Sequence, residues 1–116
     1  KIESVRGIDL ARSARATLGR LMAARGDLYV EVLQPHRVLA ALRELIQADP
    51  EAIAASRILT SLAFGDVPEE QDITDVAYLL SLGYRTLMLG DEVCLRRDSV
   101  LAALNLLEAI AGEVQS

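Results

Sequence analysis

Three short apolar runs, separated by longer segments of helical periodicity, are the feature that most restricts how this 116-residue chain can fold. The runs are Leu21–Ala24, Ala52–Ala55 and Thr86–Leu89, and each has the length of a short buried strand. Between them, apolar residues recur at helical spacing, as they do over 38–46 and 73–80. This alternation predicts an α/β fold of parallel βα units, in which ligands bind at the carboxyl ends of the strands.

Residues that start or stop helices set the expected helix boundaries. The expected helices cover about 8–18, 35–49, 72–83 and 99–113, with a short helical piece around 58–62. Pro50 would end the second of the long helices, and Gly83 would end the third. Asp72 or Thr74 would cap the third helix at its start, and Asp98 would cap the last.

The composition supports packed helices and buried parallel strands, and it excludes several classes of protein. Apolar residues make up 52% of the chain but aromatic residues only 3%, which argues against an all-β sandwich. The net charge of −5 and the lack of a basic block argue against a nucleic-acid or membrane partner. No apolar run approaches the roughly 18 residues of a membrane span, and the first residues do not resemble a signal peptide. The single cysteine, Cys94, excludes an internal disulfide and favours a cytoplasmic setting.

Three charged residues fall at strand positions from which they could meet. Lys1 and Glu3 would share one face of an opening strand, because side chains alternate along a strand. Asp27 follows the next strand, so Glu3 and Asp27 would supply two carboxylates of the kind that magnesium prefers. Lys1 would add a fixed positive charge for a developing oxyanion or phosphoryl group. On spacing alone, a solvated Lys1 and Glu3 at an exposed terminus is the simpler interpretation.

Small and polar residues follow the first two apolar runs at equivalent positions. Arg25–Asp27 are expected to form a turn, in which Gly26 lets backbone amides approach an anion. Ser56 directly follows the second run, where its hydroxyl would hold a water or an oxyanion or, more commonly, cap a helix. His36 and Cys94 have no second His or Cys at metal-ligand spacing, and the sequence contains no P-loop or dinucleotide-binding motif.

Four short motifs follow one another in a fixed order along the chain. Residues 1–7 read Lys-Ile-Glu-Ser-Val-Arg-Gly, and residues 21–31 read Leu-Met-Ala-Ala-Arg-Gly-Asp-Leu-Tyr-Val-Glu. Residues 55–62 read Ala-Ser-Arg-Ile-Leu-Thr-Ser-Leu, and residues 75–77 read Asp-Val-Ala, followed by a Leu-Met-Leu run. In this order, collinearly over nearly the whole chain, they resemble pyruvate kinase over the second half of its catalytic barrel. The corresponding family motifs are Lys-Ile-Glu-Asn, Met-Val-Ala-Arg-Gly-Asp-Leu-Gly-Val-Glu, Ala-Thr-Gln-Met-Leu-Glu-Ser-Met and Asp-Val-Ala-Asn.

The resemblance implies a catalytic lysine and a divalent metal site. Lys1 would stabilise the charge of the enolate and of the phosphoryl group during transfer. Glu3 and Asp27 would hold the divalent cation, Mg²⁺ or Mn²⁺, that bridges the protein and phosphoenolpyruvate. The family also uses potassium, which the resemblance assigns to residues absent from this segment. Phosphoryl transfer depends on such positioning and charge neutralisation more than on covalent catalysis.

The resemblance also implies a substrate site formed by the same strand ends. Ala24, Arg25 and Gly26 would place backbone groups against the substrate carboxylate, with Asp27 beside them. Ser56 stands where the family has a threonine that binds substrate and takes part in enolate protonation. The implied partners are phosphoenolpyruvate or pyruvate, together with ADP or ATP.

The implied fold is the second half of a (β/α)₈ TIM barrel of the phosphoenolpyruvate/pyruvate-binding type, with residues 1–116 forming a single segment of it. A complete barrel needs about 250 residues. We therefore expect the chain to belong to a longer protein, or to pair with a partner or a second copy, and to be inactive by itself. The complete protein would be a cytoplasmic phosphotransferase of glycolysis that transfers a phosphoryl group between phosphoenolpyruvate and ADP.

Two other functions remain compatible with the sequence. A catalytically degenerate pyruvate-kinase-like module, kept for assembly or ligand sensing, is favoured by three departures from the family. Tyr29 replaces a glycine, Ser56 replaces a threonine, and residues 68–72 carry acidic side chains where the family has a basic one. A citrate-lyase-type barrel also binds magnesium with acids on adjacent strands, but it does not account for the later motifs.

Overall fold

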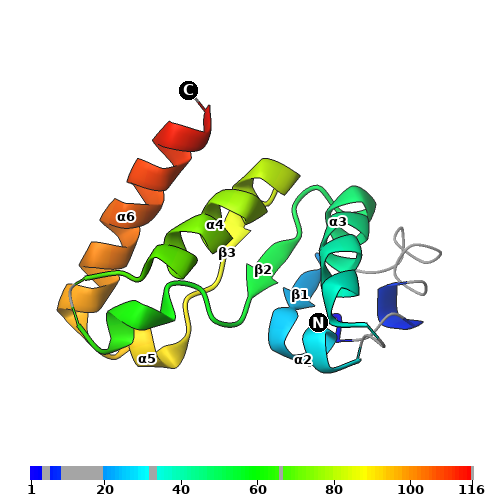
Figure 1. Cartoon of the computed structure of the whole chain (residues 1–116), viewed down its shortest axis with the longest axis horizontal. Helices are drawn as coiled ribbons and strands as arrows, with labels where there is room; N and C mark the ends of the chain where they lie inside the picture. The colour runs from blue at the N-terminus through cyan, green and yellow to red at the C-terminus, as the bar shows by residue number, and fades with distance from the viewer. Residues whose placement is uncertain (4–5, 9–19, 32–33, 66, 116) are drawn as a thin grey trace.

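The chain forms an α/β structure whose strands run through the middle of the molecule (Figure 1). This computed structural model describes residues 1–3, 6–8, 20–31, 34–65 and 67–115. The first expected helix, over 8–18, lies almost entirely outside the described residues.

The three apolar runs form a parallel sheet in the order β1-β2-β3. Its strands are β1 (Met22–Ala24), β2 (Ile53–Ala55) and β3 (Thr86–Leu87), so each strand is shorter than the run that predicted it. Ile2 forms a parallel bridge to Ala23, which places the first residues of the chain beside β1. The prediction of parallel strands alternating with helices is confirmed.

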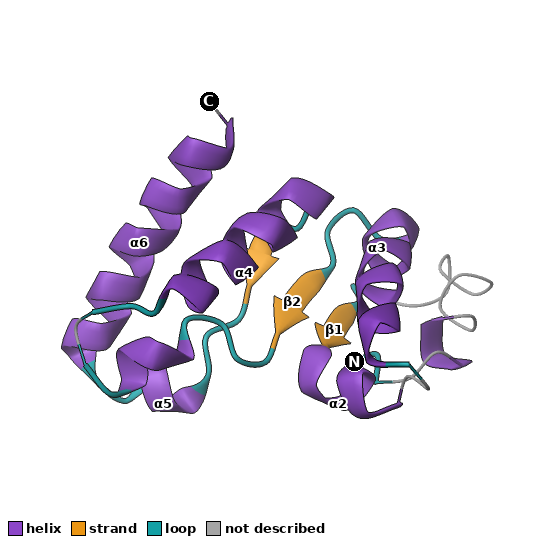
Figure 2. Ribbon diagram, viewed as in Figure 1, coloured by secondary structure: helices purple, strands orange, loops and turns teal. Residues whose placement is uncertain are grey.

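Helices cover the strands and meet in two groups at opposite ends of the molecule (Figure 2). The α-helices are α2 (Arg25–Glu31), α3 (Val38–Ala48), α4 (Glu70–Leu82), α5 (Asp91–Cys94) and α6 (Arg97–Gln115), and the 3₁₀ turns are η1 (Pro35–Arg37) and η2 (Thr60–Ala63). At one end α2 packs against α3, and at the other end α4 packs against α6. Within the described part of the chain, no helix combines the length and the apolar character needed to cross a bilayer.

The sequence signals for helix ends are confirmed for α3 and α4. Helix α3 ends at Ala48, with Asp49 as its C-cap directly before Pro50. Gly83 ends α4 with a φ of 115°, a left-handed conformation that glycine adopts without a Cβ clash. Leu45, in the middle of the apolar stripe of α3, is fully buried in the core.

Two expected features at helix starts are wrong. Residues 25–27 are not a turn but the first turn of α2, because β1 passes directly into this helix without an intervening loop. Asp98 does not precede α6, because the helix already begins at Arg97. Asp98 instead lies in the first helical turn, where its negative charge is favoured by the positive end of the helix dipole.

The expected caps of α4 are also wrong. Its N-cap is Glu69, which makes no side-chain capping bond. Asp72 instead accepts hydrogen bonds from the backbone N–H and the hydroxyl of Ser61, which joins α4 to η2. Thr74 donates its hydroxyl hydrogen bond to the Glu70 carbonyl one turn back inside the helix. The Asp72 carboxylate thus bonds to η2 and does not form the cap of α4 that the local sequence pattern predicted.

Tyr84 joins α3 to the residues that follow α4. This side chain is fully buried, and its hydroxyl donates a hydrogen bond to the carbonyl of Leu42 at 2.7 Å. Burial raises the pKa of the Tyr84 phenol above its usual value of about 10. The folded state therefore holds the phenolic proton more tightly than the unfolded state. This contribution to stability is fully present below about pH 10 and is lost as the pH rises further.

We expect Tyr84→Phe to lower the free energy of unfolding by about 1 kcal/mol at neutral pH, because a buried hydrogen bond is lost. The variant should also lose stability less steeply than the parent above about pH 10, because it has no buried phenol to ionise. Urea denaturation at neutral and alkaline pH measures both effects, with Tyr29→Phe at an exposed phenol as the control. Equal alkaline slopes for the parent and Tyr84→Phe would contradict this prediction.

Candidate functional site

The carboxyl ends of β1 and β2 lie level with each other. The parallel register pairs Ala24 with Ala55, which are the last residues of the two strands. Arg25 and Ser56, which come next, therefore leave the sheet at the same edge. The amide of Ala24 also donates a hydrogen bond to the carbonyl of Ile2 at 3.0 Å. Three segments that are distant in sequence thus meet at one edge of the sheet.

Three charged side chains occupy this edge. Lys1 Nζ lies 3.0 Å from Glu3 Oε1 and 4.0 Å from Asp27 Oδ2. Lys1 and Glu3 flank Ile2, whose side chain belongs to the hydrophobic core, so the two charged groups turn to the other side of the backbone. The structure therefore brings the three predicted residues together, with one positive charge held between two carboxylates.

The Lys1 ammonium is both paired and accessible. The side chains of Lys1, Glu3 and Asp27 are 60%, 50% and 56% exposed. The hydrogen bond to Glu3, followed by the charges of Glu3 and Asp27, raises the pKa of Lys1. Lys1 is also the only lysine in the sequence. This edge therefore presents an ammonium that is protonated at neutral pH and that a ligand can reach from solvent.

Gly26 and Ser56 approach each other closely at the same edge. A Cβ added to Gly26 would lie 3.0 Å from Ser56 Oγ, so a side chain there would force the hydroxyl to move. Ser56 has a φ of 77°, and Arg57 and Leu59 have φ values of 60° and 53°. Each left-handed, non-glycine residue costs of the order of 1 kcal/mol, and such strain concentrates at functional sites. The hydroxyl of Ser56 is not the cap of η2, whose N-cap is Leu59.

A cavity of about 240 Å³ lies among these residues. Its lining includes Lys1, Ala24, Gly26, Asp27, Ser56 and Met88. Glu3 lies beside the cavity through its ion pair with Lys1. The opening segment and the ends of all three strands therefore contribute to one hollow, which contains most of the residues that the sequence singled out.

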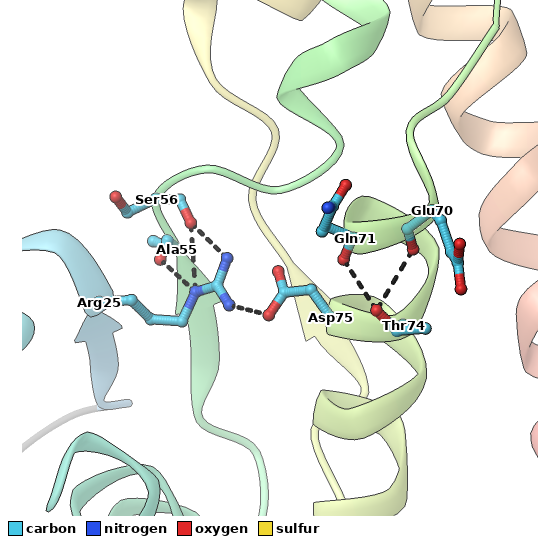
Figure 3. A network of polar contacts seen from close by, with 7 residues as sticks. All are labelled: Arg25, Ala55, Ser56, Glu70, Gln71, Thr74 and Asp75. Atoms are coloured by element: carbon cyan, nitrogen blue, oxygen red, sulfur yellow. Dashed lines mark hydrogen bonds and ion pairs between the residues drawn. The ribbon is translucent and has the colours of Figure 1, made fainter. Parts of the chain in front are cut away.

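The Arg25 side chain is not part of the lining of this cavity and extends from α2 toward α4 and the end of β2 (Figure 3). Its Nη1 donates to Asp75 Oδ1 at 2.6 Å, which links the start of α2 to α4. Its Nε donates to the carbonyl of Ala55 at 3.2 Å, and its Nη2 donates to the carbonyl of Ser56 at 2.5 Å. The backbone of Arg25 thus borders the candidate site, while its guanidinium holds the chain that follows β2.

A second cavity of about 360 Å³ lies on the guanidinium side of Arg25. Its lining includes Arg25, Tyr29, Leu42, Ser56, Asp75 and Tyr78. Tyr29 lines this second cavity and is half exposed. Ser56 borders both cavities.

The carboxylates at the edge suit a divalent cation that takes its other ligands from elsewhere. Among the residues that the structure describes, no group of three or more His, Cys, Asp or Glu could hold a metal ion. Glu3 and Asp27 nevertheless face a single positive charge, the Lys1 ammonium. Mg²⁺ is usually held by one or two protein carboxylates, with water and substrate oxygens completing its octahedron. This pair fits such an ion.

Asp75 and Met88 belong to the site region but were not assigned a role from the sequence. Asp75 stands in the Asp-Val-Ala motif, yet no spacing rule reveals that its partner is Arg25, 50 residues earlier. Met88 follows β3 directly, as Ser56 follows β2. This equivalent position after a strand is the sequence signal from which its place in the cavity lining could have been predicted.

Curated proteins that are similar in sequence are pyruvate kinases. Pyruvate kinase 2 of Saccharomyces cerevisiae is 31% identical over 115 residues, which cover 96% of this chain and 22% of that protein. Pyruvate kinase of Dictyostelium discoideum is 29% identical over 119 residues, which cover 99% of this chain and 23% of that protein. No protein-family model matches the chain.

A solved structure shares the fold. The crystal structure of a pyruvate kinase from Cryptosporidium parvum matches with a TM-score of 0.80 and 24% sequence identity, covering 95% of this chain and 23% of that chain. The chain thus spans less than a quarter of the length of the pyruvate kinases that it matches. The resemblance predicted from the motifs is confirmed, and the chain is a pyruvate-kinase-like sequence, similar to one segment of that enzyme.

Proposed function

We propose that the edge formed by Lys1, Glu3, Asp27 and Ser56 binds phosphoenolpyruvate and a divalent cation in a pyruvate kinase reaction. The observation that carries this proposal is the Lys1 ammonium held between two carboxylates beside a cavity of about 240 Å³. The similarity of nearly the whole chain to pyruvate kinases supports it. The substrate is anionic at both its phosphate and its carboxylate, and the Lys1 ammonium, together with a bound divalent cation, would offset that charge at this edge.

The chemistry is the transfer of a phosphoryl group from phosphoenolpyruvate to ADP. The P–O bond of phosphoenolpyruvate breaks, its electron pair stays on the enol oxygen, and a terminal oxygen of ADP takes the phosphoryl group to give ATP. The enolate then takes a proton at its methylene carbon and becomes pyruvate. Lys1 would stabilise the enolate oxygen and the transferring group, because its ammonium is held in place and protonated. Ser56 would direct its hydroxyl to the protonation step from the cavity wall.

The other groups at the edge would anchor the cation and the substrate. Glu3 and Asp27 would hold Mg²⁺ or Mn²⁺, and the ion when bound would neutralise charge on the phosphoryl group and the enolate. Ala24, Arg25 and Gly26 would present backbone groups to the substrate carboxylate, because β1 passes into α2 at this point. Potassium would be bound by residues elsewhere in the complete protein.

The strands would form part of the second half of a closed (β/α)₈ barrel. Parallel sheets are normally covered on both faces, and a complete barrel contains about 250 residues. Residues 1–116 would therefore be one segment of the barrel, completed by further residues of a longer protein, by a partner or by a second copy. The complete protein would act in the cytoplasm as a phosphotransferase of glycolysis, with phosphoenolpyruvate or pyruvate and ADP or ATP as its partners.

An assay of the full-length protein for pyruvate formation tests the proposal. With phosphoenolpyruvate, ADP, Mg²⁺ and K⁺, we expect turnover that Lys1→Ala lowers by about a hundredfold or more, because a group that stabilises developing charge is lost. Arg97→Ala removes an exposed cation on α6 and should keep the parental rate. Undiminished turnover in Lys1→Ala would contradict the role given to this lysine. Metal binding by the parent without turnover would favour the degenerate module instead.

A further inference from the structure

We propose that Asp75 is a positioning residue that acts through Arg25 to hold the Ser56 hydroxyl at the candidate site. The inference rests on the proposed function, because it gives Ser56 a place in the protonation of the enolate. Asp75 lies on α4 and lines the second cavity, on the far side of Ser56 from Lys1. Its effect on the reaction would therefore be transmitted and not direct.

Arg25 is the link between Asp75 and the chain after β2. Arg25 Nη1 donates a hydrogen bond to Asp75 Oδ1 at 2.6 Å. Its Nη2 and Nε both donate to the Ser56 carbonyl (Figure 3), and the two donor–acceptor distances are 2.5 Å and 3.2 Å. The Arg25 and Asp75 side chains are only 13% and 32% exposed, so solvent screens this ion pair less than a surface pair.

The segment that Arg25 holds is strained. Ser56 and Arg57 both have left-handed backbone conformations, which residues with a Cβ adopt only when the surrounding structure holds them there. Fixing the Ser56 carbonyl fixes the peptide plane between these two residues. That plane determines where the Ser56 side chain starts, and its Oγ lies 3.0 Å from the point that a Cβ of Gly26 would occupy. The hydrogen bonds of Arg25 to Asp75 and to the Ser56 carbonyl therefore set the position of the Ser56 hydroxyl at the candidate site.

Asp75 is needed because the Arg25 side chain by itself does not keep its guanidinium on the Ser56 carbonyl. An arginine side chain has many rotamers, and its planar fork bonds two acceptors at once only when its plane is fixed. Without the carboxylate, the guanidinium would leave a partly buried charge unpaired beside a cavity of about 360 Å³. It would turn toward solvent, and the Ser56 carbonyl would lose its donors.

The test compares Asp75→Asn with the parent in the full-length protein. The readout is exchange of the methyl hydrogens of pyruvate in D₂O, in which a C–H bond breaks to give the enolate and a deuteron then returns to the same carbon. We expect exchange to fall about tenfold to a hundredfold, the loss expected from a small misplacement of a reacting group. The affinity for Mn²⁺ should change by less than about twofold, because Glu3 and Asp27 are untouched. Asp98→Asn, an exposed carboxylate on α6, is the matched control and should keep both values.

A second variant separates positioning from general damage. Asp75→Glu keeps the ion pair but shifts the carboxylate by one methylene, so exchange should be intermediate between the parent and Asp75→Asn. It decides the question alone if Asp75→Asn does not fold. Parental exchange in both variants, or a parallel fall in exchange and Mn²⁺ affinity, would overturn the inference while the proposed function stands. A parent that neither binds Mn²⁺ nor exchanges pyruvate would overturn the proposed function itself.

Discussion

Asp27→Asn should weaken Mn²⁺ binding by about a hundredfold or more and lower pyruvate formation in parallel. Loss of groups that merely orient a metal ligand already reduces affinity by about 10- to 100-fold, and Asp27 is one of two carboxylates that, among the described residues, pair with the Lys1 ammonium. Asparagine keeps the shape of the side chain but removes the negative charge that a hard cation prefers. Titration of the full-length protein with Mn²⁺, followed by electron paramagnetic resonance, measures the affinity directly.

Two comparisons make the Asp27 result specific. Asp98→Asn makes the same chemical change on the exposed face of α6 and should leave Mn²⁺ affinity at the parental value. Glu3→Gln should reproduce the loss, because Glu3 is the other carboxylate of the pair. Parental Mn²⁺ affinity in Asp27→Asn would show that the ion, if it binds, is held elsewhere.

Asp49→Ala should lower the free energy of unfolding by about 3 kcal/mol. The Asp49 side chain is almost completely buried, at 1% exposure, between the end of α3 and the start of β1. Its Oδ2 accepts a hydrogen bond from the Leu21 amide at 2.8 Å, and its Oδ1 accepts one from the Glu51 amide at 3.0 Å. Alanine would remove both acceptors and leave the buried amide beside β1 unsatisfied. Urea denaturation at neutral pH measures the loss.

The chemical reason for the Asp49 effect can be checked with a second substitution. Asp49→Asn keeps one carbonyl oxygen but turns an amide group toward a backbone donor, so its loss of stability should fall between those of the parent and Asp49→Ala. Glu108→Ala, at an exposed carboxylate in the middle of α6, should change stability by less than about 0.5 kcal/mol. A change that small in Asp49→Ala would mean that water replaces the carboxylate without penalty.

The sheet was predictable because it follows from short-range rules, and the same rules allowed the charged edge, although spacing alone favoured a solvated Lys1 and Glu3. A run of small or aliphatic residues of strand length gives β1 and β2, and alternation along a strand puts Lys1 and Glu3 on one side. Asp27 comes directly after β1, so the rule for carboxyl ends of parallel strands brings it to the same edge. The ordered motifs then identified the family to which these positions correspond.

Apart from the start of α6, which lies one residue before the expected cap Asp98, the features that could not be predicted depend on contacts between sequence-distant elements. Asp72 satisfies the cap pattern of α4, but its carboxylate is taken by Ser61 of η2. Residues 25–27 have the composition of a turn, but they become helical where the Arg25 side chain bonds to Asp75 and to the chain after β2. Propensity scales describe one segment at a time and therefore do not contain such partners.

The level ends of β1 and β2 also determine when the candidate site can exist during folding. The contacts of Arg25 with Ser56 and Asp75 span 31 and 50 residues of chain, so large loops must close before either contact forms. Contacts of such long range form slowly, and they vanish when the strand pairs separate. A partly folded chain can therefore contain α3 and α6 without any part of the site. Ligand binding at this edge would consequently report on complete assembly of the sheet, and helix content would not.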